Sequence, residues 1–217
     1  CDHLWEHYAY TRDKRFLEWA YPIMKGSAKF YLDMLITEPK HGWLVTAPSN
    51  SPENGFKMPD GKVARVCMGP TMDMQILREL FGNCIEAAKT LGIDDEFRTR
   101  LAESRAKLAP TRIGKHGQIM EWLEDYEEIE PHHPHVSPPY GLHPYDEITP
   151  DGTPELAEAA RRPQHGMVHG VESQLLGPPA RRQPRPPVAG PVDHARRAQP
   201  LRPAPAVPDR RQFRRHG

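Results

Sequence analysis

Apolar and polar positions along most of this chain follow the period of an α-helix. The clearest stretch is residues 72–91, where apolar side chains return every three or four positions until Gly92, a residue type that often ends a helix. Similar reasoning predicts further helices over residues 2–10, 14–20, 21–36, 95–108 and 154–162. The pattern therefore predicts an all-α fold.

The ends of these helices also carry recognisable signals. Pro22 would lie in the first turn of its helix, where a missing N–H costs little. Three residues stand where an N-cap is expected: Thr71, Asp94 and Thr153. No segment alternates strictly over a useful length, although short strands fit residues 43–46 and 63–67.

The chain changes character at about Pro163. Beyond it the hydrophobic period is lost and the sequence becomes rich in Pro, Arg and Ala, a composition that cannot bury enough apolar surface to fold. Of 29 basic and 29 acidic residues, 10 Arg and 2 Asp fall in residues 178–217, which leaves 19 and 27 for residues 1–177. The zero net charge is thus a cancellation of −8 against +8, and we predict a folded part over residues 1–162 and a disordered tail over residues 163–217.

The loop over residues 41–54, HGWLVTAPSNSPEN, offers candidate chemistry. Two prolines fix φ there, and Ser and Asn side chains can bond their own backbone, so Glu53 should be held in place. The indole of Trp43 offers an apolar face to a pyranose, and a held carboxylic acid can protonate a glycosidic oxygen. A structural turn with a solvated glutamate is the alternative interpretation.

Several longer segments extend this picture, and together they resemble glycoside hydrolase family 95, the α-L-fucosidases. They run in order from His3 to about Arg162 and read HLWEHYAYTRD, YPIMKGSAKFYLDML, HGWLVTAPSNSPENGF, GPTMDMQILRELF, IGKHGQIMEWLEDYEE and HVSPPYGLHP. The resemblance implies an (α/α)6 toroid, here incomplete, that hydrolyses terminal α-linked L-fucose with inversion. Its expected partner is a fucosylated oligosaccharide or glycoconjugate, and it implies no cofactor.

Inversion requires an acid on one side of the glycosidic bond and an activated water on the other. The resemblance places the acid at Glu53, with Glu121 in QIMEWLED as the second candidate. The candidate sugar contacts are Trp43, Asn50, Asn54, His133 and His135. The family positions its water with an N-x-N asparagine pair and a later aspartate, and nothing in this chain matches that pair.

Two further residue groups have plain alternatives. The acidic run around Glu121 is typical of a solvated face, although like charges would raise the pKa of a carboxyl that pointed into a pocket. The histidines at 132, 133, 135 and 143 lack a cysteine or a helical His-x-x-x-His pair, so we predict no metal site. In the family this stretch reads close to HRHVSHLYGLYP, and Pro134, Pro138 and Pro139 stand here in place of arginine, histidine and leucine.

The basic tail has a simple explanation in the genetic code. A permitted codon choice for residues 166–177 reads AWSMAWKVNFWA one base later, and residues 199–217 can be shifted to NLFDLHPPFQIDGNFGGM, both similar to the family. We interpret the tail as out-of-frame translation, with the frame lost between about Ala160 and Gly166. The aspartate that assists the base would then be encoded across the codons of Arg210 and Arg211 and be missing from the polypeptide.

The remaining features narrow the function classes. Cys1, Cys67 and Cys84 form no close pair, and Cys84 should be a packing residue on a helix. No apolar run is long enough to cross a bilayer, so we expect no membrane partner. Because we interpret the basic tail as out-of-frame translation, we expect no nucleic-acid partner either. The compartment and the oligomeric state stay open. Besides a hydrolase fragment that is inactive as this polypeptide, two alternatives remain: a non-catalytic module that binds fucosylated glycans, and a helical scaffold with a basic interaction tail.

Overall fold

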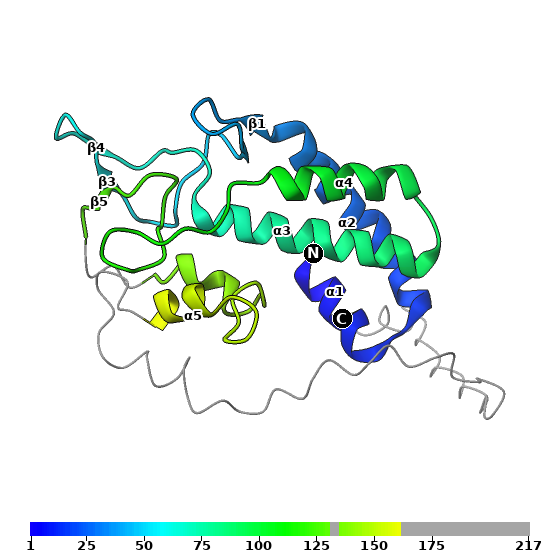
Figure 1. The fold of residues 1–217 in the computed structure, drawn as a ribbon. Helices are drawn as coiled ribbons and strands as arrows, with labels where there is room; N and C mark the ends of the chain where they lie inside the picture. Colours follow the sequence, from blue (N-terminus) through cyan, green and yellow to red (C-terminus); the bar gives the residue numbers. More distant parts are fainter. Residues whose placement is uncertain (131–134, 162–217) are drawn as a thin grey trace, which may run out of the picture. The chain divides into compact units, whose positions relative to one another are not determined.

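The computed structural model describes residues 1–130 and 135–161 (Figure 1). The predicted tail and the histidines at 132 and 133 lie outside the described residues. The α-helices in the described part are α1 (Asp2–Thr11), α2 (Lys14–Met34), α3 (Thr71–Leu91), α4 (Asp95–Lys107) and α5 (Pro154–Arg161), with a 3-10 helix η1 (Pro138–Gly141). The strands are short: β1 (Ile36–Thr37), β2 (Leu44–Val45), β3 (Phe56–Lys57), β4 (Val63–Ala64) and β5 (Glu127–Glu128).

Helix α3 lies at the centre of the main hydrophobic core. It packs against α2, α4 and η1, and it runs antiparallel to α4 (Figure 1). The side chains of Met74, Leu77 and Phe81 are fully or almost fully buried, as their helical spacing predicts. Cys84 is also buried in this core, which confirms its packing role.

Two small antiparallel sheets complete the described part. Strands β1 and β2 form one pair, and the order β4-β3-β5 forms the other sheet. In the second sheet Phe56 pairs with Ala64 on one side and with Glu128 on the other. This pairing brings the chain that follows the 41–54 loop against the acidic run after Glu121. The prediction was thus right for the helical character and for strands near residues 44 and 63, and it missed β1, β3 and β5.

One predicted boundary was wrong, because residues 14–34 form a single helix. Pro22 lies inside α2, where it removes one backbone donor. The buried face continues through it with Leu17, Ala20 and Met24, so the packing of this face outweighs the local cost of the proline.

Two predicted caps were also wrong in mechanism. The helix begins at Thr71 itself, and the Thr71 hydroxyl donates to the Met120 carbonyl at 2.5 Å instead of capping α3. Asp94 does precede α4, but its carboxylate accepts hydrogen bonds from Tyr21 and Lys25 on α2. Gly92 ends α3 in the left-handed conformation as expected.

Candidate active site

The loop between β2 and β3 is fixed at its base by backbone and side-chain bonds. Ser49 and Cys67 exchange two backbone hydrogen bonds of 2.9 and 2.8 Å. The hydroxyls of Thr46 and Ser49 both donate to one carboxylate oxygen of Asp73, at 2.6 Å each. Because Asp73 lies in the first turn of α3, the loop is tied directly to the central helix.

Glu53 lies at the exposed side of this loop in an unusual backbone conformation. Its φ of 56° falls in the left-handed region, which costs a non-glycine residue roughly 1–2 kcal/mol. Its carbonyl accepts from the Arg65 guanidinium at 3.1 Å, and its carboxylate lies 3.8 Å from Nδ1 of His135. The Glu53 side chain is 77% exposed and that of His135 is 45% exposed, so the pair faces solvent.

The neighbours of Glu53 are buried, in contrast. The Ser51 hydroxyl donates to Oε1 of Glu121 at 2.6 Å, and Ser51 is completely buried. Asn54 is 3% exposed, its Oδ1 accepts from the Gly55 N–H at 2.7 Å, and its side chain lies near enough to Glu128 to influence the pKa of that carboxyl. The backbone on both sides of Glu53 is therefore anchored inward while the glutamate itself points out.

Two carboxyls of the acidic run, Glu121 and Glu128, influence each other through their charges. Burial raises the pKa of Glu128 to about 7, and the negative charge of Glu121 adds to this, partly offset by the hydrogen bond from Asn54. Glu121 is the second candidate for the acid, and the structure places it beneath the loop, bonded to Ser51. The two candidates thus occupy different settings: Glu53 faces solvent, and Glu121 supports the loop from below.

Trp43 is held by neighbours on the same side of the molecule. Its ring stacks on that of His41 with centroids 4.1 Å apart, and the Arg112 guanidinium lies 5.6 Å from the ring centroid. Glu38 fixes His41 by accepting its backbone N–H at 2.8 Å. Although desolvation opposes ionisation there, the backbone N–H groups of His41 and Lys40 hold the pKa of Glu38 below its usual value. One face of the predicted sugar platform is therefore occupied by His41.

The other predicted sugar contacts are placed as follows. Asn50 is exposed on the same turn as Glu53, and its Nδ2 donates to the Ser51 carbonyl at 3.4 Å. His135 lies beside the Glu53 carboxylate. The structure therefore brings Glu53 and His135 together, whereas it buries Asn54, and His133 lies outside the described residues.

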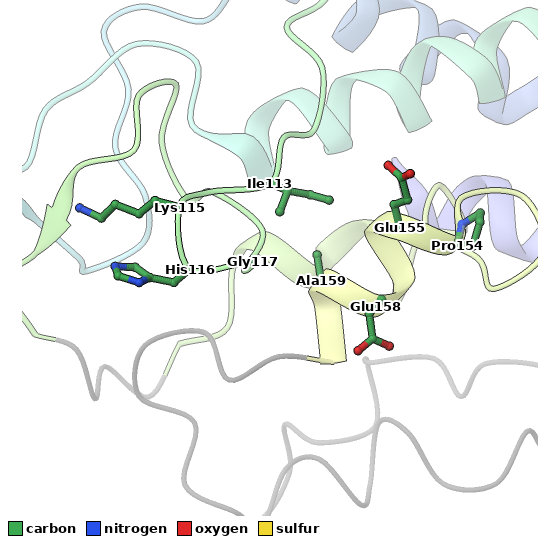
Figure 2. Close-up of a pocket in the computed structure, with 8 residues that line it drawn as sticks. All are labelled: Ile113, Lys115, His116, Gly117, Pro154, Glu155, Glu158 and Ala159. Carbon is green, nitrogen blue, oxygen red and sulfur yellow. The ribbon is translucent and has the colours of Figure 1, made fainter.

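Two cavities lie away from Glu53. One of about 620 Å³ is bordered by α5 and the turn at Lys115–Gly117. In Figure 2 the Lys115 and His116 side chains extend away from α5, and the Glu155 and Glu158 carboxylates leave α5 in different directions. The second, of about 240 Å³, shares Lys115 and His116 and is also lined by Glu128. The charged groups of the first cavity do not converge on one point, so we do not assign the active site there.

In residues 1–130 and 135–161, no three His, Cys, Asp or Glu side chains are grouped so that they could hold a metal ion. No helix in that part of the chain has the length and apolar character needed to span a membrane.

The helix-rich fold of the described residues agrees with the helical catalytic domain that the sequence motifs predicted. A sequence model of the glycosyl hydrolase family 95 catalytic domain matches residues 1–164, and the chain belongs to this family. It is 47% identical over 161 residues to alpha-L-fucosidase 2 of Arabidopsis thaliana, covering 73% of this chain and 19% of that protein. It is 35% identical over 147 residues to a probable alpha-fucosidase A of Aspergillus niger, covering 65% of this chain and 18% of that protein. The chain thus spans about a fifth of the length of these relatives.

Some residues of the site were not found from the sequence. Asp73 and Glu128 hold the loop, yet they lie 24 and 74 positions from the residues they bond, Ser49 and Asn54. Asp73 could have been noticed as an acidic residue in the first turn of a predicted helix. Nothing in the local pattern distinguishes Glu128 from its acidic neighbours.

Proposed function

We propose that this chain is part of an inverting α-L-fucosidase that hydrolyses terminal α-linked L-fucosyl groups of glycans, with Glu53 as its general acid. The observation that carries the proposal is the setting of Glu53, a solvent-facing carboxylate on a loop fixed from both sides. The names of the two fucosidase relatives support the choice of sugar. We assign the described residues around Glu53 to the acid side of the site.

The proposed reaction follows from the chemistry of inversion. The protonated Glu53 carboxyl gives its proton to the glycosidic oxygen as the C–O bond breaks. Water attacks the anomeric carbon from the opposite face, and its proton passes to a base that other parts of the enzyme provide. His135, at 3.8 Å from the Glu53 carboxylate, is placed to contact the sugar or the leaving group on the acid side.

We also propose that the helices are a segment of an (α/α)6 toroid. Successive helices pack as neighbours, with α1 against α2, α2 against α3 and α3 against α4. The antiparallel α3–α4 hairpin in Figure 1 has the form of one repeat of such a toroid. In a closed toroid, further helices would surround the exposed Glu53 and His135 side chains.

A chimera tests the catalytic assignment. Residues 1–161 of this chain would replace the 47%-identical segment of the Arabidopsis alpha-L-fucosidase 2, and hydrolysis of an aryl α-L-fucoside would be measured. Glu53→Gln should lower kcat by about 10²–10⁴-fold with little change in KM, because the amide cannot give the proton. Glu127→Gln is the matched control, since that side chain is 68% exposed and lies outside the loop. Unchanged turnover in Glu53→Gln would refute the assignment.

A further inference from the structure

The two residues that flank Glu53 in the turn are held by acidic residues of a single distant segment. The Ser51 hydroxyl donates to Glu121 at 2.6 Å, and the Asn54 side chain interacts with Glu128, whose strand β5 pairs with β3 directly after the turn. Ser51 and Asn54 are both buried, whereas Glu53 is 77% exposed. Movement of either flanking side chain would move the backbone that carries the Glu53 carboxylate.

The supporting segment is itself firmly attached to the core. The Thr71 N–H donates to the Glu121 carbonyl at 3.0 Å, which ties Glu121 to the start of α3. Glu128 lies in β5 opposite Phe56, and the Ile129 N–H donates to the Gly55 carbonyl at 3.0 Å. The turn is therefore gripped at two points by groups whose own backbone is fixed.

Both carboxyls serve as acceptors for the residues of the turn. The Ser51 hydroxyl donates to Oε1 of Glu121 at 2.6 Å, so Glu121 is the acceptor. Burial and the Glu121 charge favour a proton on Glu128 up to near neutral pH. A protonated Glu128 keeps its carbonyl oxygen as an acceptor for Asn54.

We propose that Glu121 and Glu128 are positioning residues, which hold Ser51 and Asn54 and thereby fix the left-handed turn that presents the Glu53 carboxylate. The role rests on the proposed function, in which Glu53 is the acid. Glu121 and Glu128 act through the turn and do not exchange protons with the substrate. Glu121 therefore has a different role from the one for which its sequence context made it a candidate, which was to donate a proton.

Hydrogen–deuterium exchange on the full chain tests whether the pair holds the turn. The Asn54 N–H donates to the Ser51 carbonyl at 3.2 Å, and the Gly55 N–H donates to Asn54 Oδ1, so both amides report on the turn. Glu121→Ala and Glu128→Ala should each speed exchange of these amides about tenfold, because one buried hydrogen bond is lost. Glu→Gln at either position keeps an acceptor and should restore slow exchange. Exchange in both Ala variants equal to that of Glu127→Ala would overturn the proposal.

Kinetics in the chimera then separate positioning from catalysis. Glu121→Ala and Glu128→Ala should lower kcat about 10–100-fold with KM nearly unchanged, because the acid is displaced from the bond it protonates. The Gln variants should stay within about threefold of the parent chimera, a difference of well under 1 kcal/mol in the barrier. A Glu121→Gln variant as slow as Glu53→Gln would make Glu121 a proton donor and overturn its positioning role. Full turnover in Glu53→Gln would instead remove the proposed function, while the exchange result would still decide whether the pair holds the turn.

Discussion

The raised pKa of Glu128 predicts how the free energy of unfolding changes with pH. In the unfolded chain this carboxyl should titrate near its ordinary value of 4.5, whereas in the folded chain burial and the Glu121 charge raise its pKa to about 7. The folded state therefore binds the proton more tightly. The stability that Glu128 contributes is fully present below about pH 4.5 and is lost as the pH rises through about 7.

The size of the effect follows from the shift. A change from 4.5 to about 7 corresponds to about 3 kcal/mol at 1.36 kcal/mol per pKa unit. Because Glu128 is only partly buried, screening by solvent reduces this to about 1–2 kcal/mol. Glu128→Gln keeps an acceptor for Asn54 and cannot ionise, so above neutral pH it should be more stable than the parent chain by that amount.

Thermal unfolding of the full chain at low concentration measures this difference. At about pH 8, Glu128→Gln should raise Tm by roughly 2–8 °C, and at about pH 4.5 the two proteins should unfold at the same temperature. Glu127→Gln is the control, because Glu127 is 68% exposed and its pair with Lys57 at 3.9 Å contributes little. A Tm gain that is equal at both pH values, or absent at pH 8, would refute the raised pKa of Glu128 in the folded chain.

Three further predictions use other parts of the chain. Trp19 and Phe30 are 60% and 62% exposed on α2 and should promote self-association. Replacing both by Gln should lower the average mass measured by sedimentation and change the free energy of unfolding by less than about 0.5 kcal/mol. An unchanged mass would contradict this. Gly69→Ala should lower the free energy of unfolding by about 1–3 kcal/mol more than Gly61→Ala does. Both glycines have positive φ, but only the new methyl group at position 69 would lie 2.8 Å from the buried Val45. Equal losses of stability in denaturant unfolding would show that the core rearranges to accept the methyl group. Resequencing the DNA across codons 155–170 should reveal a lost or gained base, and an uninterrupted frame that still encodes this tail would remove the frameshift interpretation.

The helices could be predicted because their information is local. The spacing of Met74, Leu77 and Phe81 defines the buried face of α3, and Gly92 marks its end. The prediction of two helices in place of α2 was wrong because Pro22 is a strong local signal for a helix start. The buried face that continues through Pro22 is stabilised by packing against α3, which the local sequence does not reveal. Local signals thus locate helices, whereas tertiary packing decides whether two neighbouring helical segments join into one helix.

The candidate site divides along the same line. The loop containing Glu53 stood out because prolines, serines and asparagines gather around one glutamate, and the structure shows that its turn is held. The expectation that Ser49 and Ser51 bond their own backbone was wrong in mechanism, since their hydroxyls bond Asp73 and Glu121 instead. Those partners are 24 and 70 positions away, beyond any local pattern.

The exposure of Glu53 has a physical explanation in the distribution of anchors. Ser51 and Asn54 are buried, and the Glu53 backbone has left-handed φ. The Glu53 carboxylate itself contacts an exposed residue, His135, at 3.8 Å. A glycine or asparagine would adopt the same φ at lower cost, and two other residues with similar φ, Arg12 and Asp94, lie at helix ends. Glu53 has no helix end to account for its conformation, so the strained turn supports our proposal that its carboxylate is functional.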